Sequence, residues 1–243
     1  MLDDPGRVLL VVVLQDLVFF VLTVGFFWVG VAVSRGLLGR PVSYSLAPLG
    51  FSKPKDGYLP GTGLGLIVGS VAVGASLVIT PLSIYVLEAL GYSTESKVQG
   101  PFKEGLTAWI GEDPGTAIPA IIAVVVFFGP AIEELVFRGA IFGGLYRLGL
   151  FLSRKLGGKA ESYKETGEKV SFALSALFSS VAFALAHLEP VALPVLLILA
   201  VSLCTLYRYT GSLLPNLVAH ATFNSFAVLI IILSGLQMLP VPA

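Results

Sequence analysis

The chain has 243 residues, of which 56% are hydrophobic and only 12% are charged, and its mean hydropathy is +0.91. A soluble domain carries roughly a quarter charged residues, so this composition excludes an ordinary water-soluble protein. Fifteen basic and fifteen acidic residues leave no net charge, and a single cysteine, Cys204, excludes an internal disulfide. The composition predicts an all-α, polytopic membrane protein that is surrounded by lipids and has no nucleic-acid partner.

Apolar segments long enough to cross a bilayer occur six times along the chain. A spanning helix needs roughly 20 apolar residues, and the candidates are residues 8–33, 64–90, 116–150, 170–187, 191–206 and 213–233. The third is long enough for two helices broken near Pro130, because proline removes a backbone donor and clashes with the preceding turn. We therefore expect a transmembrane helical bundle of about six to eight spans, with N-terminal helices and loops in residues 1–115 and a helical core in residues 116–243.

Loop charges predict the orientation of the spans, because loops rich in Lys and Arg stay on the cytoplasmic side. The loops after the first and third spans are basic, whereas the loop after the second span is acidic. Arg208, between the fifth and sixth spans, falls on the same side as the basic loops. This alternation predicts that the N- and C-termini both lie on the non-cytoplasmic side.

Ionisable side chains inside the predicted spans carry the functional information, because each costs at least ~2.5–3.5 kcal/mol on insertion scales. They are Asp16, Glu133, Glu134, Arg138, His187 and His220. Glu134 and Arg138 are four residues apart, so they share a helix face and can form a structural ion pair. Glu133 has no partner at helical spacing, and an unpaired buried carboxylate is expensive unless it does chemistry.

Two histidines and an asparagine supply chemistry that complements this carboxylate. His220 and Asn224 are four residues apart on the last span, and His187 ends the fourth. A carboxylate beside a histidine can deprotonate water, and a histidine with an amide can donate hydrogen bonds to the oxyanion of a tetrahedral intermediate. Glu133, His187 and His220 also form the residue set of a zinc site, although the spacing His-Glu-x-x-His is absent.

These motifs resemble those of a known family. Glu133-Glu134-x-x-x-Arg138, Phe183-x-x-x-His187 and His220-x-x-x-Asn224 are similar to the signature of the CPBP (Abi) intramembrane proteases. The best-described members of this family are the type II CAAX prenyl endopeptidases. The motifs follow one another in the family's order within residues 117–234, and the first two spans do not carry the resemblance.

The resemblance implies an intramembrane endopeptidase whose catalytic core is residues 116–243. Glu133, assisted by His187, would activate the attacking water. His220 and Asn224 would form the oxyanion hole. The remaining motif residues, which would brace the site, are Glu134 and Arg138.

The same resemblance bears on cofactors and partners. Although the family's usual name is metalloprotease, the resemblance favours a hydrolase without an obligatory metal, and Zn²⁺ is the alternative. The implied partner is a peptide or protein substrate, and prenylated CAAX proteins are one such class.

One geometric condition must hold for these residues to form a single site. Glu133 and His187 each lie 17 residues from the predicted cytoplasmic end of their span, whereas His220 lies eight residues from it. At about 1.5 Å per residue the depths are ~25 Å and ~12 Å. We expect the third and fourth helices to extend into the cytosol, rather than the turn at residues 208–212 to sink into the protein.

Two other functions fit part of the pattern. A transporter or proton relay also uses intramembrane acidic residues and histidines, and it would account for Asp16, which the protease motifs do not explain. Against it, the chain has no second half that resembles the first. A non-catalytic membrane scaffold of the same fold is the other alternative. The structural interpretation of Asp16 is a polar contact between helices near Gln15.

Overall fold

The computed structural model describes residues 5–37, 39, 45–96, 99–156 and 161–239. These residues are mostly helical and form no strand. Six of their helices are long and apolar enough to cross a membrane, so the predicted all-α polytopic bundle is confirmed. The two chain ends, whose side of the membrane was predicted, lie outside the described residues.

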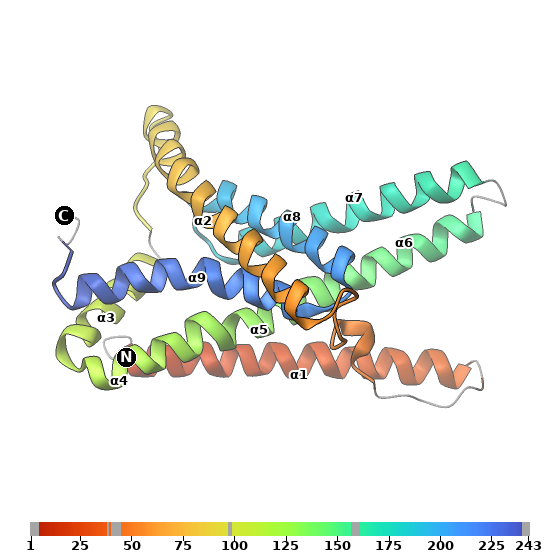
Figure 1. Ribbon diagram of the computed structural model, residues 1–243, viewed down its shortest axis with the longest axis horizontal. Coiled ribbons are helices and arrows are strands. Elements are labelled where there is room, and N and C mark those ends of the chain that lie inside the picture. Colours follow the sequence, from red (N-terminus) through yellow and green to blue (C-terminus); the bar gives the residue numbers. More distant parts are fainter. Residues whose placement is uncertain (1–4, 38, 40–44, 97–98, 157–160, 240–243) are drawn as a thin grey trace.

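The helices follow one another in a simple order (Figure 1). The N-terminal part consists of α1 (Pro5–Leu37), the 3-10 turn η1 (Ala47–Leu49), α2 (Tyr58–Ala89) and α3 (Gln99–Glu112). A continuous helical path follows, made of α4 (Pro114–Ile121), η2 (Ile122–Phe128), α5 (Gly129–Glu134), η3 (Leu135–Phe142) and α6 (Gly143–Leu156). The last three helices are α7 (Glu161–Ala186), α8 (Leu193–Thr210) and α9 (Leu213–Gly235).

The long third segment does not break at Pro130. It continues as one path in which two π-helical stretches, η2 and η3, flank α5. Pro130 has no N–H, and the N–H of Gly129 bonds to the carbonyl of Val124, five residues earlier. The wider π-turn thus accommodates the proline without ending the helix.

Helix α3 is an element that the sequence analysis did not predict. It lies in the acidic connection after α2 and buries Leu106 and Ile110 against the bundle. Phe102 and Trp109 pack partly buried against the same cluster, and the 14 residues of the helix are too few to span a bilayer of about 30 Å. A search for membrane-length apolar segments therefore passed over it.

Helices α2 and α9 approach each other closely through small residues. Gly61, Gly65 and Gly69 are buried at four-residue spacing on one face of α2. A Cβ atom would lie 2.5 Å from the carbonyl oxygen of Pro215 if added at Gly65, and 2.5 Å from that of Ala219 if added at Gly69. Small residues allow such backbone contact between membrane helices. The stripe therefore holds α9, which carries two candidate site residues, directly against α2.

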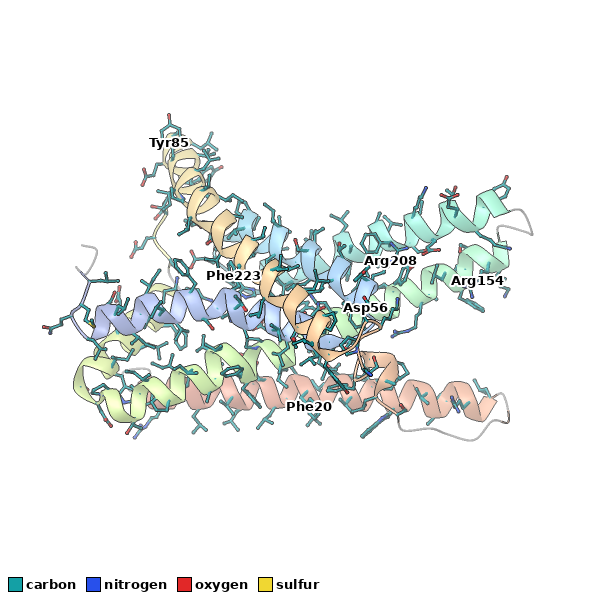
Figure 2. All side chains as sticks on the ribbon, in the orientation of Figure 1. Phe20, Asp56, Tyr85, Arg154, Arg208 and Phe223 are labelled. Atoms are coloured by element: carbon teal, nitrogen blue, oxygen red, sulfur yellow. The ribbon has the colours of Figure 1, made fainter. Side chains whose placement is uncertain are left out.

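The turn between α8 and α9 is bound by the segment that follows η1. The backbone N–H of Lys55 donates to the carbonyl of Thr210 (3.0 Å), and the Ser52 hydroxyl donates to that of Gly211 (2.6 Å). Helices α6 and α7 extend as a pair beyond this turn (Figure 1). Figure 2 shows that α6 extends beyond α8 at this end of the molecule. Arg154, on α6, lies nearer this end than Arg208, which is in the last turn of α8. The turn is buried as well, since Thr210 is 3% and Ser212 is 1% exposed. Helix length and burial of the turn therefore together account for the smaller number of residues between the turn and His220.

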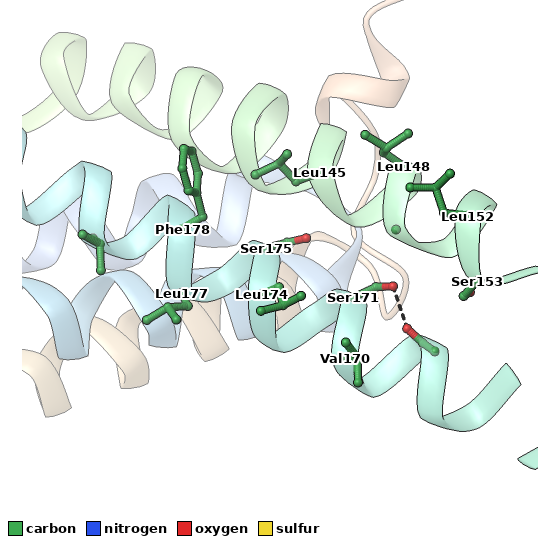
Figure 3. A pocket seen from close by; sticks show the side chains of 13 residues that line it. Leu145, Leu148, Leu152, Ser153, Val170, Ser171, Leu174, Ser175, Leu177 and Phe178 are labelled. Carbon is green, nitrogen blue, oxygen red and sulfur yellow. Dashed lines mark hydrogen bonds between the residues drawn. The ribbon is translucent and has the colours of Figure 1, made fainter. Parts of the chain in front are cut away.

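The hairpin of α6 and α7 also relies on small residues and has an apolar outer face. A Cβ on Gly149 would lie 2.6 Å from the Ser171 hydroxyl oxygen. A groove of about 710 Å³ follows the hairpin (Figure 3), with exposed leucines such as Leu148, Leu152 and Leu174 in its wall. An apolar, exposed wall of this kind suits contact with lipid tails.

Candidate active site

The four predicted catalytic side chains come from three parts of the chain and lie in one region of the bundle. Glu133 is on α5, His187 directly follows α7, and His220 and Asn224 are on α9. Glu133 Oε2 is 3.9 Å from His187 Nε2 and 3.7 Å from His220 Nε2. The Glu133 side chain is 31% exposed, whereas that of His220 is 2% exposed. The structure therefore brings this carboxylate and both histidines together, as a single site requires.

Glu134 is the centre of a buried polar network next to this group. Its Oε1 accepts hydrogen bonds from Arg138 Nη1 (2.9 Å) and His220 Nδ1 (2.8 Å). Its Oε2 accepts one from Asn216 Nδ2 (3.1 Å). The Arg138 guanidinium also lies 4.3 Å from the centre of the Phe183 ring, which adds a cation–π contact. The predicted ion pair is thus present, and it anchors the histidine on α9 to the helix that carries Glu133.

Glu133, the neighbour of Glu134, has a different environment. Its Oε2 is buried and makes no hydrogen bond among the described residues. Successive residues on a helix point about 100° apart, so the two carboxylates face different surroundings. A buried carboxylate oxygen without a donor costs free energy. Its surroundings are therefore better suited to a reacting group than to a structural one.

Hydrogen bonds on the other side of each ring determine what the histidines offer to Glu133. His187 Nδ1 lies 2.8 Å from the carbonyl oxygen of Phe183, and His220 Nδ1 lies 2.8 Å from Glu134 Oε1. A carbonyl or carboxylate oxygen only accepts, so each Nδ1 is the donor. In a neutral ring Nε2 is then an acceptor. Three acceptor atoms, two imidazole nitrogens and one carboxylate oxygen, consequently face one another.

Three converging acceptors are also the residue types of a zinc site. Zinc with bonds of about 2.0–2.1 Å holds tetrahedral ligand atoms roughly 3.3 Å apart, whereas Glu133 Oε2 is 3.7 and 3.9 Å from the two histidine nitrogens. In the part of the chain that the structure describes, no three His, Cys, Asp or Glu side chains are grouped to hold a metal ion. The set matches zinc in residue type but not in spacing.

Asn224 is held by a carbonyl group that the π-helix leaves free. Its Nδ2 donates to the carbonyl of Val125 at 2.9 Å. In a regular helix the N–H of Gly129 would bond to Val125, but here it bonds to Val124. The hydrogen bond orients the amide and uses one of its two donors, so the second stays available.

Sequence reasoning missed Asn216. This side chain is fully buried, and its Nδ2 bonds both to Glu134 and to the carbonyl of Leu203 (2.8 Å). It lies four residues before His220, which itself lies four residues before Asn224, so the three form one row on α9. That spacing was present in the sequence, but a search for ionisable residues overlooks an uncharged amide.

Comparisons with known proteins concern the same part of the chain. Residues 115–226 match the family described as Rce1-like, type II CAAX prenyl endopeptidase Rce1-like. This stretch contains all three motifs, so the resemblance read from the sequence is confirmed. The family match and the six apolar helices together identify the protein as an integral, multi-pass membrane protein.

A curated relative and the solved structures add two further findings. The chain is 29% identical over 113 residues to a Bacillus subtilis protein named "Putative membrane peptidase YdiL". The aligned part covers 46% of this chain and 38% of the relative, so the chain accounts for well under half of that protein's length. No solved structure matches the chain.

Proposed function

We propose that the protein is an intramembrane endopeptidase in which Glu133 activates water for attack on a peptide bond. One observation carries this proposal: Glu133 Oε2 lies 3.9 Å from His187 Nε2 and 3.7 Å from His220 Nε2, although the three residues come from distant parts of the chain. The match to the Rce1-like family over the same residues supports it.

The distances suggest how the water would be held. Separations of 3.7 and 3.9 Å are too long for direct hydrogen bonds, and one water molecule can bridge them. A water that donates to Glu133 and His187 would keep a lone pair for the substrate carbonyl carbon. As the carbon–oxygen bond forms, the water proton passes to Glu133. When the carbon–nitrogen bond breaks, Glu133 returns that proton to the leaving amine.

The oxyanion that forms in between requires hydrogen-bond donors. Asn224 offers its second amide N–H, held in place by the bond of the first to Val125. His220 is the second proposed donor, and the hydrogen bond from its Nδ1 to Glu134 fixes the orientation of its ring. Both roles belong to the proposal.

The substrate, the cofactor and the orientation are proposals as well. The family match makes a prenylated CAAX peptide the first substrate to test. The reaction is proposed to need no metal, with zinc on Glu133, His187 and His220 as the alternative. The end formed by α6 and α7 is proposed to face the cytosol, with both termini on the other side, and the alternating loop charges support this orientation.

The test is cleavage of a farnesylated CAAX peptide by the purified protein in detergent. Wild type, Glu133→Gln, and wild type with a chelator are compared, and an unprenylated peptide of the same sequence is run beside them. Release of the terminal tripeptide by wild type but not by Glu133→Gln is expected. Equal rates for the two proteins would overturn the role of Glu133. Absence of cleavage of both peptides by wild type would contradict the proposed substrate class.

A further inference from the structure

Asp16, on α1, is a buried carboxylate that the mechanism above does not use. It is 6% exposed, and its Oδ2 makes no hydrogen bond among the described residues. The neighbouring Gln15 is exposed on the outer side of the helix. The polar contact that the sequence suggested for Asp16 is therefore not made by this oxygen.

Asp16 lies against the same helix that carries the proposed base. Its Oδ2 is 3.6 Å from the position that a Cβ on Gly129 would occupy. Gly129 and Glu133 are four residues apart on α5, so they share one face of that helix. The first span therefore contributes an acidic group next to the candidate site, outside residues 115–226.

The energetic cost of this arrangement needs an explanation. A carboxylate at membrane depth costs several kcal/mol when it lacks partners. Among the described residues, Asp16 Oδ2 and Glu133 Oε2 are the two carboxylate oxygens that are buried without a hydrogen bond. Asp16 Oδ2 lies against Gly129 of α5, and Glu133 lies one helical turn after Gly129 on the same helix. A residue kept only for packing would be more stable as leucine.

An adjacent cavity shows where a ligand can approach. It measures about 560 Å³ and is lined by Phe20 of α1, by Phe128 and Ile132 on either side of Gly129, and by Glu134. Phe20, labelled in Figure 2, lies one helical turn after Asp16 on α1. Helix α1 is at the edge of the bundle and packs along α3, η2, α5 and η3 (Figure 1). The cavity thus borders α1 one helical turn after Asp16, and it borders α5 at Ile132 and Glu134, the two neighbours of Glu133 in sequence.

We propose that Asp16 is a substrate-binding residue of this site, whose Oδ2 accepts a backbone N–H from an extended peptide bound in the cavity beside the contact of α1 and α5. This inference rests on the proposed endopeptidase function. A substrate N–H that is withdrawn from water in this site needs an acceptor on the protein. The four-residue offset from Gly129 to Glu133 is about 6 Å along the helix, and an extended chain covers about that length in two residues. Asp16 therefore holds an N–H about two residues from the scissile bond.

The test combines variants with altered substrates. Wild type, Asp16→Leu and Asp16→Asn are assayed on a fluorogenic farnesylated CAAX peptide, with Gln15→Leu as the matched control on the exposed side of the same helix. In a series of peptides, one backbone amide at a time, other than the scissile one, is replaced by an ester, which removes one N–H. Melting temperatures are measured for each protein.

The acceptor role predicts a particular pattern. Asp16→Leu raises KM by about tenfold or more with little change in kcat, because the contact is made equally in the ground state and the transition state. Asp16→Asn keeps an acceptor oxygen and shows a smaller rise, and Gln15→Leu shows none. Wild type loses a similar factor when one particular amide becomes an ester, and Asp16→Leu is insensitive at that position. Asp16→Leu melts at the same temperature as wild type or higher.

Other results separate the two proposals. An unchanged KM for Asp16→Leu, or retained sensitivity at every ester position, overturns the role of Asp16 while the endopeptidase function stands. A lower melting temperature with unchanged kinetics assigns Asp16 a structural role. If wild type cleaves no peptide, the proposed substrate class fails, and the binding role of Asp16 that is argued on that substrate is overturned with it.

Discussion

Replacing Glu134 by glutamine removes the charge that compensates Arg138 inside the bundle. The two side chains are 1% and 0% exposed and their charged atoms are 2.9 Å apart. Removing one partner of a buried ion pair costs about 3–5 kcal/mol, because the other charge stays buried and uncompensated. For a chain of this size about 1 kcal/mol corresponds to 2–4 °C in melting temperature. We therefore expect Glu134→Gln to lower the melting temperature by roughly 6–20 °C and to lower activity as well.

Glu133→Gln is the matched comparison, because it makes the same chemical change one residue away. Glu133 forms no comparable close ion pair, and its side chain is 31% exposed, so its replacement should change stability by less than about 1 kcal/mol. Turnover should nevertheless fall by at least about 10²–10⁴-fold, the usual contribution of a general base. Thermal melting and peptide cleavage in the same detergent measure both effects. Equal melting temperatures and equal rates for the two variants would refute the division of roles.

Three further predictions concern packing, the oxyanion hole and the metal. Gly69→Ala should destabilise the protein by about 1–3 kcal/mol, because its Cβ would meet the carbonyl of Ala219 at 2.5 Å. Gly74→Ala, whose Cβ meets nothing within 4 Å, should not, and a similar melting temperature for both would contradict the close contact of α2 and α9. Asn224→Ala should reduce kcat by about 10²–10³-fold with little change in KM, and a change confined to KM would exclude the oxyanion role. Treatment with a chelator should leave peptide cleavage unchanged, and activity that is lost on chelation and returns with added Zn²⁺ would establish a metal requirement.

Properties that depend on local sequence were predictable for this protein. The six spans follow from segments of about 20 apolar residues, because a bilayer of fixed thickness imposes that length. The pairing of Glu134 with Arg138 follows from four-residue helical spacing, and the structure shows this contact at 2.9 Å. Composition, hydropathy and i,i+4 spacing were sufficient for these features. Each of them depends either on the overall composition of a segment or on residues within one helix.

Other features depend on how segments that are distant in sequence pack against each other. Helix α3 was missed because its burial of Leu106 and Ile110 is decided by the neighbouring helices and not by its own modest hydropathy. The hydrogen bond from Asn224 to the carbonyl of Val125 depends on the packing of α9 against the π-helical turn before Pro130. Neither helix α3 nor the contact of Asn224 can be recognised from the hydropathy of a single segment.

The sequence was therefore sufficient to identify a polytopic helical membrane protein and to single out the ionisable side chains inside its spans, because burial cost and helical periodicity act within each segment. The packing of α5, α7 and α9 was needed to place Glu133 within 3.9 Å of both histidines. It was also needed to place Asp16, 113 positions before Gly129 in the numbering, against that residue. Such contacts arise from glycine stripes and buried polar networks between helices. Residue spacing along one helix does not show which residue of a neighbouring helix it will contact.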